Sequence, residues 1–332
     1  YTGYQKVANE ASRKKFEDAW GVSLPDKPGL TVNEVIDAVD SGDIRLLYIM
    51  GENPMISDPD INHVERALKK CEFLVVQDIF LTETAELADV VLPAGTFAEK
   101  DGTFTSTDRR VQRIRRAIPD VGESKVDWEI LSEIMRRLGY ENKFQTSEQI
   151  MDEIASLTPQ YGGISFTRLE NESLCWPCPD AKHPGTPTLH MKAFSRGERA
   201  KFIPHQYKAS AELPDAEYPY LLTTGRVLYQ YHTRTMTGKN EGVNQIAGWS
   251  YIEINPADAK KLGVADGGML NVKSRRGEVV TMARVTDKLK EGVVFMPFHY
   301  ADGPANKLTN AALDPIAKIP EFKVCAVTIS RA

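Results

Sequence analysis

The sequence predicts a two-domain protein, in which an α/β domain built on a parallel sheet is followed by an all-β barrel domain. The first half alternates short apolar runs with helical segments, and the chain from Tyr218 onward alternates short apolar runs with tight turns. The first pattern is typical of a parallel sheet and the second of a barrel or sandwich. The chain of 332 residues also exceeds the length of roughly 250 residues beyond which single cores rarely grow.

Three apolar runs in the first half are predicted to be buried strands of one parallel sheet. These runs, at 44–50, 73–76 and 89–92, alternate with predicted helices at 60–70 and 83–87. A helical connection between consecutive strands is the crossover that parallel pairing requires. The order of these elements therefore predicts an α/β arrangement.

A strongly amphipathic helix is predicted over residues 127–138, and Gly139 is expected to end it. Its apolar side chains recur at helical spacing and are expected to face the core: Trp128, Leu131, Ile134, Met135 and Leu138. With this helix, residues 1–160 are predicted to form the α/β domain.

The chain beyond residue 160 divides into a connecting segment and a β domain. Residues 161–213 lose regular periodicity and accumulate proline and glycine, so they are predicted to be a connection that wraps the surface. Residues 214–332 are predicted to close as a small β-barrel. Its clearest local signals are a hairpin around Arg275-Arg276-Gly277 and a brief helix over 255–263 with asparagine, proline and glycine at the expected positions.

Composition and charge exclude several classes of function. Hydrophobic residues make up 42% of the chain and charged residues 26%, the formal net charge is −5 and the isoelectric point is near 5.8. No basic excess is available for nucleic acid. No apolar stretch approaches the roughly 20 residues that a membrane span needs. We therefore expect a soluble protein with no nucleic-acid partner and no membrane span, in which local groups hold any anionic ligand.

Cysteine usage predicts a reducing compartment. The chain has four scattered cysteines, too few for a disulfide framework or an iron–sulfur ligand set. Cys175 and Cys178 have the spacing of a zinc or redox half-site, but no second ligand pair stands near them, and we interpret them as structural. We expect a cytoplasmic protein, with the periplasm as the alternative. The start at Tyr1, without methionine or a signal-peptide pattern, is interpreted as the interior of a longer polypeptide or a product cut from one.

The segment 221–238 is the strongest candidate for a ligand site. Its apolar start is a predicted strand, which ends at Gly225 and is followed at once by Arg226. A guanidinium grips a phosphate through two parallel hydrogen bonds. The loop that follows adds polar side chains from Gln230, His232, Thr233 and Thr235 and contains no carboxylate. The alternative is a polar turn between two strands.

Two strand ends of the predicted parallel sheet form a second candidate site. The first strand runs into Gly51, Glu52 and Asn53, and the second ends in Gln77 and Asp78. Ligands of open α/β sheets bind in the crevice beyond the carboxyl ends of the strands. A plain strand-to-helix turn is an equal alternative for the first of these segments.

The order of several motifs resembles the molybdopterin oxidoreductases along the whole chain. The motifs are Gly-Glu-Asn-Pro from Gly51, Gln-Asp from Gln77, Glu-x-x-Gly-Thr-Phe from Glu99, Arg-x-Gln from Arg110, Asp-Trp from Asp127 and the Thr-Gly-Arg to Met-Thr series from Thr224. The similarity is highest to the C-terminal half of the formate dehydrogenase catalytic subunit. Neither a P-loop nor a Gly-x-Gly-x-x-Gly fingerprint is present.

This resemblance implies a fold and a set of cofactor residues. The α/β part is expected to be the last part of a dinucleotide-binding-like domain that holds one pterin guanine dinucleotide through Gly51, Glu52, Asn53, Gln77, Asp78 and Asp127. The β part is expected to be a double-psi barrel that holds a second one through Thr224, Gly225, Arg226, Gln230, His232, Thr233, Asn306 and Lys323. Asp78 or Asp127 is expected to read a guanine base, and Arg226 to meet pyrophosphate.

The resemblance also implies an activity and partners. The chain is expected to be the C-terminal portion of a formate dehydrogenase with a bis-(molybdopterin guanine dinucleotide) cofactor that carries molybdenum or tungsten. The metal ligand and a 4Fe-4S cluster belong to the N-terminal half, with which this chain is expected to be active. Iron–sulfur or flavin electron-transfer subunits are the expected partners, and formate and carbon dioxide the substrate pair. The alternatives are a nitrate reductase, a formylmethanofuran dehydrogenase, or a binding or assembly module without redox chemistry.

Overall fold

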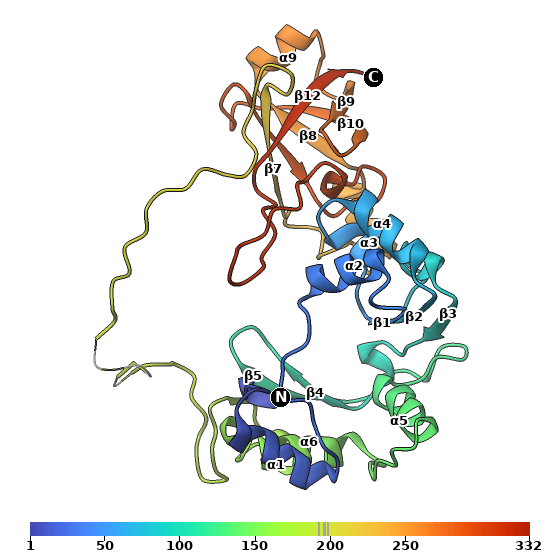
Figure 1. The fold of residues 1–332 in the computed structure, drawn as a ribbon, viewed down its shortest axis with the longest axis vertical. Helices are drawn as coiled ribbons and strands as arrows, with labels where there is room; N and C mark the ends of the chain where they lie inside the picture. The colour runs from blue at the N-terminus through green and yellow to red at the C-terminus, as the bar shows by residue number, and fades with distance from the viewer. Residues whose placement is uncertain (192, 195–196, 198) are drawn as a thin grey trace. The chain divides into compact units, whose positions relative to one another are not determined.

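A computed structural model of the chain describes residues 1–191, 193–194, 197 and 199–332. The chain forms two compact units, and each contains two separate stretches of sequence (Figure 1). The first unit consists of residues 1–29 and 93–205, and the second of residues 30–92 and 206–332. This grouping follows contacts between residues rather than chain order. It differs from the domain boundaries predicted from the sequence, at residues 160 and 213, which stay a prediction.

The second unit begins with a three-stranded sheet in the order β1-β2-β3 (Figure 1). Its strands are β1 (Leu46–Met50), β2 (Phe73–Asp78) and β3 (Val90–Pro93), and β1 pairs with β2 in parallel. Its helices are α2 (Val32–Ser41), α3 (Pro54–Ser57), α4 (Ile61–Lys70) and the 3-10 turn η2 (Ala85–Leu87). The predicted parallel sheet is thereby confirmed, although β1 is only half-buried because it lies at an edge of the sheet.

A closed six-stranded barrel forms the rest of the second unit, in the order β10-β8-β11-β7-β12-β9. The strands are β7 (Tyr220–Gly225), β8 (Tyr251–Ile254), β9 (Met269–Lys273), β10 (Glu278–Val285), β11 (Val293–Pro297) and β12 (Cys325–Arg331). Strand β8 was not among the predicted strands. The barrel combines two parallel pairs (β7 with β11, β8 with β10) with four antiparallel pairs, so the strands do not simply meander.

The barrel interior is an apolar core whose members come from every strand. Leu222, Ile252, Leu270, Val294 and Met296 are each fully buried in it. The connecting elements are η5 (Thr237–Lys239), α8 (Glu241–Ala247), α9 (Pro256–Leu262) and η6 (Ala305–Lys307). The predicted hairpin is the antiparallel β9–β10 pair. Helix α9 starts at an Asn255 cap and ends at a left-handed glycine, as its sequence predicts.

The first unit packs helices around a small antiparallel sheet. Its elements are η1 (Thr2–Tyr4), α1 (Glu10–Trp20), η3 (Phe97–Glu99), β4 (Gly102–Thr105), β5 (Arg110–Ile114), α5 (Asp127–Arg137), α6 (Ser147–Leu157), η4 (Pro159–Tyr161), α7 (Phe166–Leu169) and β6 (Leu174–Cys175). Strand β5 lies between β4 and β6. Of the described helices, none is both long and apolar enough to cross a membrane.

Two predictions about the first unit are wrong. The apolar stripe of α5 does not face the core: Ile130 is its buried residue, and Leu138 is 81% exposed. Spacing identifies a helix, but it does not show that the chain itself supplies the surface that covers the stripe. The start of the predicted connecting segment is also packed. Phe166, Leu174 and Cys178 are buried there in one core.

Candidate functional site

The loop 226–239 begins at the carboxyl end of the barrel strand β7. Strand β11 pairs with β7 as far as Gly225, whereas β12 pairs with the first part of β7, Tyr220 to Leu222. A Cβ at Gly225 would approach a ring carbon of Phe295 to 2.7 Å, which explains why glycine ends the strand. Thr224 is buried, and its hydroxyl donates to the Phe322 carbonyl at 2.8 Å. The backbone therefore enters the loop from a rigid base.

Two cations stand at this strand end without a carboxylate partner. The Arg226 side chain lies over the Phe298 ring, with 5.4 Å between guanidinium carbon and ring centroid. The Lys323 ammonium donates to the Thr224 carbonyl at 2.6 Å, and partial burial and then Arg226 lower its pKa. Neither side chain forms an ion pair with any residue that the structure describes. An anion is the ligand that this positive surface favours.

His299 is the residue that holds the loop in place. The side chain is fully buried after β11. Its Nε2 accepts from the Val227 backbone N–H at 2.9 Å, and its Nδ1 is bonded to the His232 carbonyl. Because Nε2 accepts, the ring is neutral and Nδ1–H donates. One imidazole thus fixes two points of the loop.

The stability of the protein is expected to fall in mild acid because of this histidine. Burial, followed by the Arg226 and His232 charges, lowers the pKa of His299 below its ordinary value of 6.5, although the bond to the His232 carbonyl opposes the shift. The unfolded chain binds this proton more readily, so the free energy of unfolding decreases as pH drops below about 6.5. Denaturant unfolding between pH 5 and 8 measures how the free energy of unfolding changes with pH. A His299→Gln variant with the same pH dependence as the wild type would contradict this role of His299.

Hydrogen bonds within the loop and to α8 use several of the loop's polar groups. Gln230 is buried; its amide donates to the Ala247 carbonyl at 2.7 Å and accepts from the Thr237 hydroxyl at 2.6 Å. Arg234 donates to Asn244 at 2.7 Å. Both His232 and Arg234 have left-handed backbone conformations, with φ of 46° and 63°. Such conformations are costly for residues with side chains, and they persist where the surroundings fix the chain.

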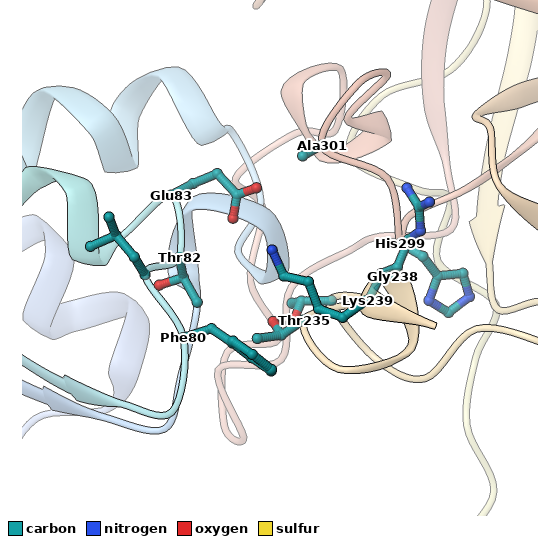
Figure 2. A pocket seen from close by; sticks show the side chains of 11 residues that line it. Phe80, Thr82, Glu83, Thr235, Gly238, Lys239, His299 and Ala301 are labelled. Carbon is teal, nitrogen blue, oxygen red and sulfur yellow. Dashed lines mark hydrogen bonds between the residues drawn. The ribbon is translucent and has the colours of Figure 1, made fainter. Parts of the chain in front are cut away.

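A pocket of about 180 Å³ lies between this loop and the segment that follows β2. Figure 2 shows the two sets of side chains facing each other, with Lys239 reaching from the loop toward Thr82 and Glu83. Hydroxyls and cations from the loop line one side: Thr233, Arg234, Thr235 and Lys239. The Nε atom of Arg234 is buried and has no hydrogen-bond partner. The pocket is therefore lined by two cations, Arg234 and Lys239, and by one carboxylate, Glu83.

Sequence reasoning missed Arg234, Lys239 and His299. Arg234 and Lys239 lie in the same stretch as Arg226. The alternation of cations with hydroxyls in that stretch is a signal that could have identified them. His299 follows a different strand, β11. Its role depends on the pairing of β11 with β7, which no local pattern encodes.

The candidate residues of the parallel sheet lie at the ends of β1 and β2, as predicted. Gly51 has a left-handed φ of 64°. Asn53 is buried; its Oδ1 accepts from the Thr84 hydroxyl at 2.7 Å, and its Nδ2 donates to Glu83 at 2.7 Å. Asn53 therefore orients the pocket residue Glu83. Glu52 is exposed beside it.

Gln77 and Asp78 are both buried at the end of β2. Gln77 accepts from the Tyr48 hydroxyl. Asp78 accepts from the Ile79 and Phe80 backbone N–H groups, at 2.7 and 3.3 Å, and so shapes the turn that leads into the pocket.

Two other candidates have clear structural partners. Asn306 is buried and donates to the carbonyls of Ile56 and Ser57, at 2.9 and 3.1 Å, so it fastens the barrel to α3. Asp127 belongs to the first unit, where it begins α5 and forms an ion pair with Lys100. A direct role in cofactor binding stays a prediction for every candidate residue.

Comparison with known protein families gives two matches. The family model described as molybdopterin oxidoreductase matches residues 1–137, and the model described as molydopterin dinucleotide binding domain matches residues 220–326. The second match contains β7, the loop 226–239 and His299.

Curated relatives share the sequence over its full length. The alpha subunit of the F420-dependent formate dehydrogenase of Methanocaldococcus jannaschii is 52% identical over 100% of this chain and 49% of the relative. Formate dehydrogenase H of Escherichia coli is 37% identical over 99% and 47%. The assimilatory nitrate reductase catalytic subunit of Bacillus subtilis is 35% identical over 98% and 48%. The chain thus spans about half the length of these relatives.

A solved structure shows the same fold. Acetylene hydratase from Pelobacter acetylenicus matches 98% of this chain and 50% of its own, with a TM-score of 0.71 and 16% sequence identity. At that identity the likeness concerns the fold alone.

Proposed function

We propose, because the chain belongs to the molybdopterin oxidoreductase family, that the carboxyl end of β7 and the loop 226–239 hold a pterin guanine dinucleotide. The observation that carries this proposal is the group of cations without ion-pair partners, Arg226 and Lys323, in a chain whose net charge is −5. A pyrophosphate is the part of the cofactor that such a group suits. His299 takes part indirectly, because it fixes the loop backbone.

The residues present fit the cofactor. The pocket beside the loop is lined by the cations Arg234 and Lys239, both suited to phosphate oxygens. At the end of β2, the carboxylate of Asp78 suits guanine, since a carboxylate accepts from N1–H and the amino group together. We include Asp127 as the second candidate for a guanine contact. When bound, the molybdenum or tungsten of the cofactor supplies the redox centre.

Formate is the proposed substrate of the complete enzyme. Formate dehydrogenase alpha subunits are among the relatives with 44–52% identity. We propose that this chain is the C-terminal portion of such a subunit. The metal ligand and a 4Fe-4S cluster lie in the remaining portion, and electrons pass to iron–sulfur or flavin subunits. Nitrate reduction is the second candidate, because a nitrate reductase subunit is 35% identical.

Two finer features of fold and location belong to the same proposal. The presence of two parallel pairs among the antiparallel pairs of the six-stranded barrel supports a double-psi connection. The parallel sheet supports a partial dinucleotide-binding-like domain. We place the enzyme in the cytoplasm, with the periplasm as the alternative, because the four cysteines are all free thiols.

Purification of the complete gene product tests the proposed function. The expected results are pterin guanine dinucleotide after acid extraction and oxidation, detected by fluorescence, and reduction of an artificial acceptor with formate. Nitrate reduction without formate oxidation would favour the second candidate. A pure protein that contains no pterin after expression with molybdate and with tungstate would contradict both.

The substitutions Asp78→Asn and Asp127→Asn are expected to have different effects. Asparagine offers one acceptor where a carboxylate offers two, so a lost guanine contact leaves a buried donor unsatisfied, at about 1–3 kcal/mol. At Asp127 the substitution removes the ion pair to Lys100. One variant should lose guanine dinucleotide and the other should lose stability. Cofactor analysis and thermal melting separate the two effects. Full cofactor and full stability in both variants would refute this placement of the base pocket.

A further inference from the structure

The side chain of Arg234, which lines the pocket beside the loop 226–239, is held by contacts with three other residues. Its guanidinium lies over the ring of Tyr300, with 5.1 Å between the guanidinium carbon and the ring centroid. Its Nη2 donates to Oδ1 of Asn244 at 2.7 Å, and its Nη1 lies 4.0 Å from Oδ1 of Asp302. The side chain is 20% exposed, so these contacts leave part of the cation open.

Gly238 provides the space that this side chain occupies. It belongs to the loop side of the pocket, as Figure 2 shows. A Cβ at Gly238 would come within 2.9 Å of Cγ and 3.2 Å of Nε of Arg234, whereas carbon atoms in contact are about 3.5–4.0 Å apart. The backbone of Gly238 is not left-handed. Glycine is therefore needed here for the packing of Arg234 rather than for an unusual φ.

Helix α8, which follows the loop, is held at both of its ends. At its start, the side chain of Asn240 caps the first turn. At its other end, the Ala247 carbonyl accepts from the Tyr300 hydroxyl at 2.9 Å and from the Gln230 amide at 2.7 Å. The middle of the helix therefore has a fixed position relative to the loop.

Asn244, in the middle of α8, joins the helix to two points of the loop. Its Oδ1 accepts from Arg234, and its Nδ2 donates to the Gly238 carbonyl at 2.8 Å. Asn244 is not one of the residues that line the pocket. A free arginine side chain loses rotamer freedom when it binds a ligand, whereas one that is already fixed does not. A residue outside the pocket can therefore change the affinity of the pocket for an anion.

We propose that Asn244 is a positioning residue for the cofactor, which holds the guanidinium of Arg234 in the orientation that meets a phosphate of the pterin guanine dinucleotide. The inference rests on the proposed function, and it extends the site to a residue beyond the pocket lining. Asn244 increases affinity because Arg234 is already ordered before the cofactor binds. Gly238 has the complementary role, since it leaves room for that orientation.

The rate at which the purified complete gene product loses its pterin tests this inference. The lost pterin is filtered from the enzyme, oxidised and measured by fluorescence. Asn244→Ala and Arg234→Ala are each expected to lose pterin about tenfold faster than the wild type, since residues in contact are coupled by effects of this order. The double variant should lose pterin no faster than Arg234→Ala, because Asn244 acts through the guanidinium. Gln245→Ala, at an exposed position of the same helix, should match the wild type.

Gly238→Ala tests the orientation of Arg234 by a second route. The added methyl group displaces the arginine, so pterin loss should again be faster than in the wild type. In Arg234→Ala the atoms that the methyl group would meet are absent, so Gly238→Ala should have no further effect in that background. An effect on the fold alone would not disappear with the guanidinium.

Three outcomes would overturn the inference: an unchanged rate in Arg234→Ala, an unchanged rate in Asn244→Ala, and an effect of Asn244→Ala that is equally large with and without Arg234. Melting temperatures of all variants show whether pterin is lost through unfolding. If Asn244→Ala does not fold, Asn244→Gln, which moves the amide by one carbon, replaces it with the same expected result. A wild-type enzyme without pterin would refute the proposed function itself, whereas retained pterin with any of the three outcomes refutes this inference alone.

Discussion

Replacing His299 with leucine is expected to destabilise the second unit strongly and to reduce cofactor content as well. Leucine can pack in the same volume, but it leaves the Val227 N–H and the His232 carbonyl without their partner. A buried polar group that loses its hydrogen bond costs about 1–3 kcal/mol, so two such groups cost roughly 2–6 kcal/mol. Chemical denaturation of the complete enzyme measures this loss.

The matched control for His299 is His205→Leu. His205 is exposed, so the same chemical change there should leave the unfolding free energy within about 0.5 kcal/mol of the wild type. His299→Gln retains one donor and one acceptor and should recover part of the stability. Equal stability of His299→Leu and His205→Leu would show that the loop does not depend on this imidazole.

Replacing Arg226 with alanine is expected to lower the pterin content of the complete enzyme without a large loss of stability. A hydrogen bond to a charged group contributes about 1.5–3 kcal/mol, so affinity should fall roughly ten- to hundred-fold. The folded chain loses little, because Arg226 is exposed and its described contact is the face of Phe298. Fluorescence of the oxidised pterin after extraction measures occupancy.

Two further variants decide what Arg226 contributes. Arg226→Lys keeps the charge but loses the two-pronged geometry, so it should recover part of the occupancy. Lys288→Ala removes an exposed cation elsewhere on the barrel and should leave occupancy unchanged. Full occupancy in Arg226→Ala would remove this residue from the proposed site. A loss of the same size in Lys288→Ala would show that overall charge, rather than position, matters.

Much of the architecture could be predicted from local pattern. The β9–β10 hairpin and the caps of α9 depend on residues that are close in sequence, and the parallel sheet follows from the order of strand, helix and strand. The amphipathic pattern of α5 correctly located the helix, but it did not predict which of its apolar side chains are buried. Leu138 is 81% exposed, because helical spacing locates a helix without showing which of its sides the rest of the chain covers.

The site could be predicted only in part. Arg226 and the strand end before it were visible, because a glycine, a cation and hydroxyls stand together in sequence. The role of His299 could not be predicted from the sequence, since only the barrel topology places its partners Val227 and His232 beside it. Gln230 illustrates the opposite case. Its polar pattern suggested a ligand, and its amide is bonded to Ala247 of α8 and to Thr237.

The division of each unit into two stretches has a consequence for folding during synthesis. The first unit contains all its residues once position 205 has been made, whereas the second needs position 332. Residues 30–92 therefore leave the ribosome long before the barrel that Asn306 fastens to them. Domains of growing chains fold as units, and partly folded intermediates expose apolar surface. We therefore expect the α/β layer to remain without its barrel contacts until the barrel has been synthesised.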